Sequence, residues 1–150
     1  MIGVWRPTPP AFAPMLAPWL AFVTPFTLTS DSQFRAVLPP SLTSKRYATA
    51  YNEVKAMGAL LNSARSTDQT NMALFFSANY LVLWNHALRD IATSQLLSID
   101  DSARLYALVN LAMVDAVITA WDTNRHFVFW RPITAIHEGD NDGNPDIGSR

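Results

Sequence analysis

The sequence predicts an all-α protein: a bundle of antiparallel helices preceded by an irregular, proline-rich arm. Apolar residues recur with the helical period from Ser41 onward, and no segment alternates convincingly with the period of a strand. Eight of the ten prolines lie in residues 1–40. We therefore expect an apolar arm over residues 1–43 and a helical part over residues 44–150.

The composition limits the classes of function. The chain has 150 residues, 49% hydrophobic and only 15% charged, against about 25% charged in a typical globular chain. A net charge of −1 provides no basic field to hold nucleic acid. The absence of cysteine excludes a disulfide framework, a thiolate zinc site and a cysteine nucleophile. So little charge predicts that a partner or a membrane covers much of the surface, or that part of the protein is missing.

The arm is rich in both prolines and aromatic rings. Proline fixes φ and removes a hydrogen-bond donor, so no long helix fits there. The rings are too many for a solvated linker, and we expect the arm to lie over the helices and bury them: Trp5, Phe12, Trp19, Phe22 and Phe26.

Hydroxyl side chains mark the starts of the expected helices. Thr43 or Ser44 can cap a first helix that runs to about residue 62. Ser66, followed three residues later by a glutamine, forms a capping box that opens a long second helix to about residue 97. Ser98 can cap a third helix in the same way, and this helix runs to about residue 124. Pro132 begins a short fourth helix.

The third helix is apolar on nearly every face, which is typical of a central helix. Its most apolar stretch, Leu105 to Trp121, is at the short limit for crossing a bilayer. Asp115 lies inside that stretch, where a charge costs about 2.5–3.5 kcal/mol on insertion scales. The apolar run from Pro14 to Leu28 is interrupted by prolines, unlike a signal peptide. We expect neither a membrane span nor a signal peptide.

Two carboxylates on the third helix, Asp115 and Asp122, need partners if they are buried. Arginines such as Arg89 or Arg104 are the expected partners, and these pairs would fix helix packing. The alternative is that the two aspartates orient a functional arginine.

Candidate chemistry concentrates in residues 121–136, WDTNRHFVFWRPITAI, where two arginines and a histidine stand among four aromatic residues. Arginine suits oxyanions because its planar fork donates two parallel hydrogen bonds and keeps its charge. Aromatic walls of low dielectric would strengthen that attraction. The segment indicates an oxyanion site, and the alternative is an arginine stacked on Trp130 for packing alone.

Oxygen-bearing side chains alternate near the end of the chain, as they do in a calcium loop: Asp140, Asp142, Asn144 and Asp146. The glycine and glutamate positions of an EF-hand are not matched. We expect a turn-rich loop and no metal site, with calcium as the alternative.

Several segments, in one order, resemble the bacterial vanadium-dependent haloperoxidases, which share a fold with the type 2 phosphatidic acid phosphatases. They are GVWRPTPPAFAP (3–14), PF with SQFR (25–35), SLTS (41–44), YNEVKAMG (51–58), STDQT (66–70), ARLYALVNLAMVDAVITAWDT (103–123), FWRPITAI (129–136) and DGNP (142–145). The resemblance implies a partial helical bundle of the haloperoxidase and acid phosphatase type, taken from the middle of a larger enzyme.

The family holds vanadate or phosphate with three motifs, of which this chain matches the first. Arg131 and Pro132 match its arginine–proline pair, and the family lysine falls at Asn124. The neighbouring Arg125 is a candidate substitute for that charge. The resemblance also implies pocket walls from Trp121 and Trp130.

The other two motifs, P-S-G-H and S-R…H, carry the family histidines and do not occur in residues 1–150. The resemblance places those histidines beyond Arg150. We therefore expect no catalytic residue in this chain, because none of its three histidines has the family context: His86, His126 and His137.

The resemblance implies a parent enzyme that oxidises halide with hydrogen peroxide on bound vanadate, while this chain alone is inactive. One alternative is a phosphatase of the same superfamily that cleaves phosphate esters through a phosphohistidine. Another is a non-catalytic helical module, and exposed apolar surface would allow self-association. The compartment stays open, with a secreted or periplasmic parent as one expectation.

Overall fold

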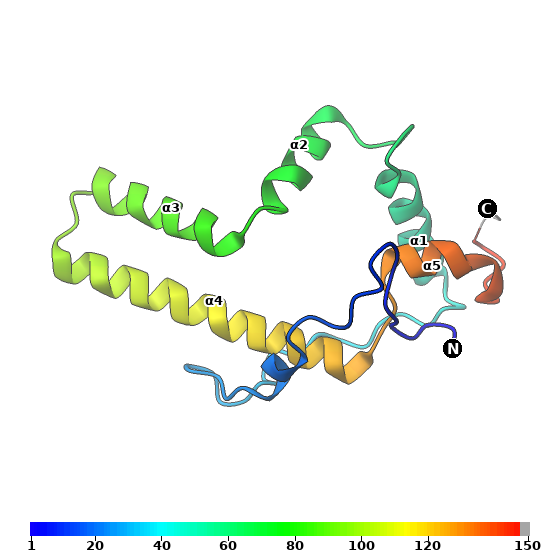
Figure 1. Cartoon of the computed structure of the whole chain (residues 1–150), viewed down its shortest axis with the longest axis horizontal. Coiled ribbons are helices and arrows are strands. Elements are labelled where there is room, and N and C mark those ends of the chain that lie inside the picture. The colour runs from blue at the N-terminus through cyan, green and yellow to red at the C-terminus, as the bar shows by residue number, and fades with distance from the viewer. Residues whose placement is uncertain (148–150) are drawn as a thin grey trace.

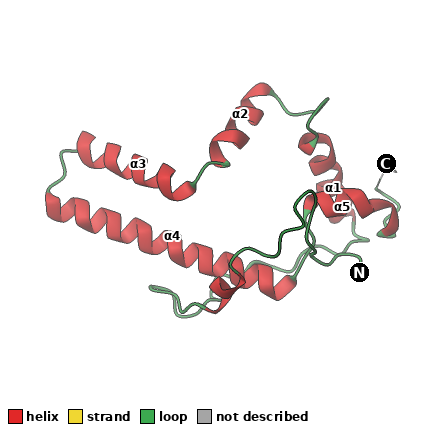
Figure 2. Ribbon diagram, viewed as in Figure 1, coloured by secondary structure: helices red, strands yellow, loops and turns green. Residues whose placement is uncertain are grey.

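The computed structural model describes residues 1–147, and within that range it is helical with no strand (Figure 2). The only strand-like pairing there is an isolated bridge between Val4 and Phe129. The all-α prediction is confirmed. Along the chain, the elements are the 3₁₀ turn η1 (Pro18–Phe22), α1 (Lys45–Gly58), α2 (Thr67–Phe76), α3 (Tyr80–Ser94), α4 (Ile99–Phe127), α5 (Pro132–Glu138) and the 3₁₀ turn η2 (Gly139–Asn141).

Side-chain caps begin α1, α2 and α4 where the sequence predicts them. The hydroxyl of Ser44 accepts the amide of Tyr47, and that of Ser98 accepts the amide of Asp101. Ser66 and Gln69 form the reciprocal capping box of α2. Helix α1 is shorter than expected and ends at Gly58, whereas α4 continues to Phe127.

The prediction of one long helix over residues 67–97 is wrong, because the chain breaks between α2 and α3. Ser77 donates its hydroxyl to the carbonyl of Leu74 at 2.7 Å. Asn79 is extended, with φ −63° and ψ 109°, and its side chain accepts the amide of Leu81. Serine and asparagine compete with the helical ladder for backbone groups, so the segment ends one helix and caps the next.

The helices form an open arrangement rather than a closed bundle (Figure 1). Helices α3 and α4 run antiparallel along each other, and α2 leads away from them towards α1, which packs on α5 (Figure 1). The buried aromatic core lies at that second contact and comprises Tyr47, Tyr51, Trp130 and Ala135. Large apolar side chains of α2 and α3 stay exposed, among them Phe75, Phe76 and Trp84.

The middle of the arm, residues 1–43, lies along the carboxyl-terminal half of α4, where η1 contacts the helix (Figure 1). Its rings are not buried there, contrary to the sequence expectation. Four of them remain between 62% and 67% exposed: Phe12, Trp19, Phe22 and Phe26. Apolar packing of these rings therefore does not hold the arm in place.

Helix α4 is less covered than a central helix would be. Its buried residues are Asp115, Ile118 and Asp122. By length and composition alone, α4 is also apolar enough to cross a membrane. The absence of a membrane span therefore stays a prediction.

Candidate functional site

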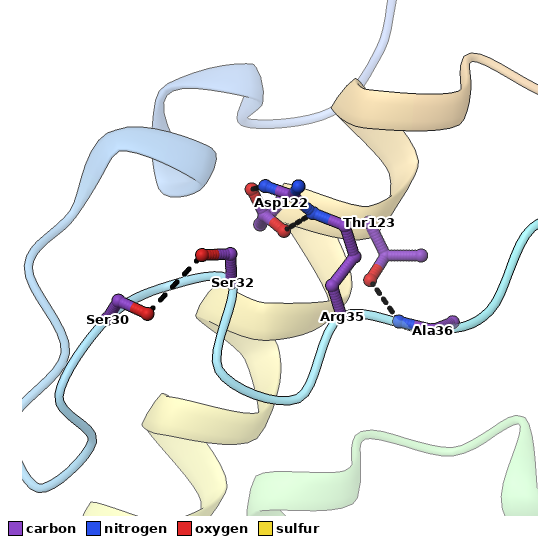
Figure 3. Close-up of polar contacts among 6 residues, drawn as sticks. All are labelled: Ser30, Ser32, Arg35, Ala36, Asp122 and Thr123. Atoms are coloured by element: carbon purple, nitrogen blue, oxygen red, sulfur yellow. Dashed lines mark hydrogen bonds and ion pairs between the residues drawn. The ribbon is translucent and has the colours of Figure 1, made fainter.

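Two buried carboxylates of α4 hold the arm against the helix. The first of them is Asp122. Its two oxygens accept the Nε and Nη2 groups of Arg35 at 2.6 and 2.7 Å (Figure 3). This bond with Arg35 holds the pKa of Asp122 below its usual range, although burial opposes the shift. Beside it, the amide of Ala36 donates to the hydroxyl of Thr123 (Figure 3). The predicted helix partners of Asp122 are therefore wrong, since its arginine comes from the arm.

Asp115 is the second carboxylate that holds the arm, and it bonds to backbone amides and one hydroxyl rather than to an arginine. It accepts the amides of Phe26, Thr27 and Leu28 and the hydroxyl of Thr27. Burial works to raise the pKa of Asp115, but these bonds together lower it. Asp115 and Asp122 are seven residues apart, which places them on one face of the helix two turns apart. The arm therefore follows that face.

The beginning of the arm folds back on the turn between α4 and α5. Val128 ends α4 in the left-handed conformation, with φ 48° and ψ 35°, which redirects the chain. Its carbonyl accepts the amide of Trp5 at 2.7 Å, and the amide of Trp130 donates to Gly3 at 3.0 Å. Further along the arm, Leu16 accepts the indole N–H of Trp121 at 2.8 Å. Two stretches of the arm therefore lie beside this turn.

A cavity of about 470 Å³ opens between the arm and this turn. Four of the five residues predicted for an oxyanion site line it: Asn124, Arg131, Trp121 and Trp130. The guanidinium of Arg131 lies 5.9 Å from the ring centre of Trp5. Neither a carboxylate nor a histidine is among the described residues that line the cavity. We call it the oxyanion pocket below.

Arg125, the fifth predicted residue, lies elsewhere. Its guanidinium stacks over the ring of Phe22 at 4.4 Å, and it does not line the oxyanion pocket. Adjacent positions of a helix differ by about 100° in direction, which explains why Asn124 faces the pocket and Arg125 does not. The structure therefore groups Arg131 with Asn124.

None of the three histidines lines the oxyanion pocket. His86 lines a separate hollow on α3 together with Arg89. His126 packs edge-on against the ring of Phe127. His137 lines another hollow, beside Arg6. Arg150, beyond which the resemblance places the family histidines, lies outside the described residues, so that expectation stays a prediction.

The acidic loop after α5 uses its side chains to form turns. Asp142 accepts the amide of Asn144 at 2.9 Å, and Asn144 accepts that of Asp146 at 3.0 Å. The side-chain amide of Asn144 also donates to the carbonyl of Leu42 at 2.6 Å, which ties the loop to the segment just before α1. These bonds favour the turn-rich loop over the calcium alternative. The described residues contain no group of three acidic, histidine or cysteine side chains able to hold a metal ion.

The sequence reasoning missed the arm's contribution to the oxyanion pocket. Trp5, Met15 and Leu16 all line it. The aromatic content of the arm was the available signal, since it predicted contact with the helices. It could not predict which rings face the pocket.

Comparison with known proteins agrees with this fold. Residues 104–144 match the model of a family described as the VCPO second helical-bundle domain. A vanadium chloroperoxidase from Curvularia inaequalis is 32% identical over 156 residues, covering 88% of this chain and 25% of that protein. The crystal structure of a bacterial vanadium-dependent iodoperoxidase superposes with a TM-score of 0.79 at 26% identity, covering 99% of this chain and 39% of the other. The chain thus spans about a quarter of the curated relative.

Proposed function

Because this chain belongs with the vanadium-dependent haloperoxidases in sequence and in fold, we propose that it supplies the arginine–proline part of an oxyanion site for vanadate. In the complete enzyme, that site would serve the oxidation of halide by hydrogen peroxide. The observation that carries the proposal is that Arg131 and Asn124 line one cavity walled by Trp121 and Trp130.

The residues present fit a tetrahedral oxyanion. The guanidinium of Arg131 offers a charged fork to two oxygens, and Asn124 offers two neutral N–H donors. The described lining contains no carboxylate to repel the anion. The cavity volume of about 470 Å³ leaves ample room for such an ion. When bound, vanadate would supply the activation of peroxide.

The protein's own part is to bind and shield the anion. Arg131 holds negative charge, while the indoles of Trp121 and Trp130 exclude water and lower the local dielectric. Asn124 carries no charge, so this chain binds oxyanions more weakly than a site with a lysine there. No histidine lines the described pocket to move a proton. We therefore expect binding without turnover from this chain alone.

A titration with orthovanadate tests the proposal. Three tryptophans line the oxyanion pocket, Trp5, Trp121 and Trp130, so we expect a saturable change in tryptophan fluorescence. Orthophosphate should compete, since it presents the same tetrahedral oxygens. Absence of a saturable change in the folded chain would contradict the proposal.

A parallel assay addresses the reaction itself. The chain with vanadate, peroxide and bromide should give no halide oxidation, and measurable vanadate-dependent turnover would show that a catalytic group has been missed. A longer protein containing this segment should oxidise bromide. Hydrolysis of p-nitrophenyl phosphate without bromide oxidation would favour the phosphatase alternative instead.

A further inference from the structure

The guanidinium of Arg131 faces an aromatic ring instead of an anionic partner. It lies 5.9 Å from the ring centre of Trp5, and both residues line the oxyanion pocket. Within residues 1–147, no hydrogen bond or ion pair joins this guanidinium to another group. Arg35 differs, because Asp122 occupies its Nε and Nη2 groups. The charge of Arg131 and its N–H donors therefore remain available to an anion.

The backbone fixes where Trp5 lies. The amide of Trp5 donates to the carbonyl of Val128 at 2.7 Å, and the amide of Trp130 donates to the carbonyl of Gly3 at 3.0 Å. These two bonds pair the start of the arm with the segment that ends just before Arg131. Because both bonds use main-chain atoms, this pairing does not depend on which side chain residue 5 carries.

An aromatic ring can hold a guanidinium without using its hydrogen-bond donors. A cation within about 6 Å of a ring centre is attracted by the negative face of the ring, and tryptophan attracts it most strongly. A carboxylate partner would instead neutralise the charge and occupy the donors. The long arginine side chain loses rotamer freedom when it is ordered. A partner that orders it before the anion arrives therefore lowers the cost of binding.

We propose that Trp5 is a positioning residue of the oxyanion site. Its ring orders the guanidinium of Arg131 at the oxyanion pocket and leaves the N–H groups free to bond a tetrahedral anion. This role rests on the proposed function and deepens it, because it makes the arm a part of the anion site. The affinity for the anion then depends on residue 5 as well as on Arg131.

The first measurement uses the chain without any anion. With ¹⁵N-labelled arginine, the Nε–H signal of Arg131 is assigned from its loss in Arg131→Lys. Protons near the face of a ring resonate upfield, so we expect this signal to move downfield in Trp5→Leu and to move less in Trp5→Phe. The signal of Arg125, which stacks on Phe22, should stay unchanged. No movement in Trp5→Leu would overturn the positioning role, whether or not vanadate binds.

The second measurement is equilibrium binding of orthovanadate by calorimetry. A cation–π contact at an exposed site is equivalent to about two- to fivefold in affinity, so Trp5→Leu should weaken binding by that factor. Trp5→Phe should lose less, because phenylalanine still presents a ring face. Trp19→Leu, at an arm ring that is 63% exposed, should bind as the parent chain does. In an Arg131→Ala background, Trp5→Leu should cause no further loss.

The outcomes separate this role from the proposed function. If the parent chain binds orthovanadate and Trp5→Leu binds it equally well, the role of Trp5 is overturned and the proposed function stands. An equal loss from Trp5→Leu with and without Arg131 would also overturn the role, since the ring would then only shape the cavity. Absence of binding by the folded parent chain would contradict the proposed function, and the arginine signal would still decide whether Trp5 holds Arg131.

Discussion

Arg35 and Asp122 form a bidentate ion pair that joins the irregular arm to the longest helix across 87 residues of sequence (Figure 3). The carboxylate is 2% exposed, and the arm's own rings stay largely in solvent. Polar bonds to Asp115 and Asp122, rather than buried apolar area, therefore hold the arm against α4. The arm in turn supplies Trp5 and Leu16 to the oxyanion pocket.

Replacing Arg35 by lysine should loosen the arm. Lysine keeps the charge but cannot reproduce the two parallel bonds of the guanidinium fork. We expect limited proteolysis within residues 23–37 to become severalfold faster, with little change in the helix content seen by circular dichroism. Arg46→Lys, on an exposed part of α1, is the matched control. Equal cleavage rates in both variants and the parent chain would show that the ion pair does not hold the arm.

Acid should release the arm from α4. The pKa values of Asp115 and Asp122 lie below the ordinary value of 3.8. A carboxyl with a depressed folded pKa stabilises the folded state above its unfolded pKa and loses this contribution as the pH falls through the folded pKa. We therefore expect full attachment above about pH 4 and progressive loss below it.

Amide hydrogen exchange measures this release directly. The amides of Phe26, Thr27 and Leu28 bond to Asp115, so their protection should fall as the pH drops below about 4. The amide of Tyr47, which bonds to the hydroxyl of Ser44, should keep its protection and serves as the control. Unchanged protection of the three arm amides well below that pH would show that the carboxylate of Asp115 does not hold the arm against α4.

Gly139 should tolerate no side chain. A Cβ there would lie 2.3 Å from the hydroxyl oxygen of Tyr51, a buried residue of the core. Gly139→Ala should lower the free energy of unfolding by about 1–3 kcal/mol, measured by urea denaturation. Adding Tyr51→Phe should recover only part of the loss, because the ring carbon Cζ remains 2.8 Å from the new group. A Gly139→Ala variant as stable as the parent would contradict this packing.

Local features of this fold could be predicted from the sequence, and long-range ones could not. The caps at Ser44, Ser66 and Ser98 each bond the backbone amide three residues later in the sequence, so a short sequence pattern is enough to predict them. The partner of Asp122 lies in an irregular segment with no periodicity to set its register. Arginines within the helices are the partners that the sequence predicts for Asp122, and no pattern in the sequence points to Arg35.

In the candidate site too, the residues close in sequence could be predicted, and those brought in by long-range folding could not. Asn124 and Arg131 are close in sequence, at the end of one helix and the start of the next, and the resemblance paired them. The contribution of Trp5 depends on the chain folding back through the bond of its amide to Val128. Arg125 is next to Asn124 in the sequence, but the rotation of the helix takes it to Phe22 instead.

Asn124→Lys should strengthen oxyanion binding. The resemblance puts a lysine at this position, and the side chain of residue 124 faces the oxyanion pocket. An added charge near the anion should raise the affinity for orthovanadate about tenfold, equivalent to about 1.4 kcal/mol. Asn124→Gln keeps an amide and should bind as the parent does. No gain from the lysine in a folded variant would place the anion away from residue 124.

The most direct test of the account is a comparison of Arg131→Ala with Arg125→Ala in equilibrium binding of orthovanadate. The two variants remove the same charge, but only Arg131 lines the oxyanion pocket, whereas Arg125 stacks on Phe22. We predict that Arg131→Ala loses at least about tenfold in affinity, as expected for a charged hydrogen bond, and that Arg125→Ala binds within about twofold of the parent chain. Equal losses in both variants, or a larger loss from Arg125→Ala, would contradict the assignment of the site.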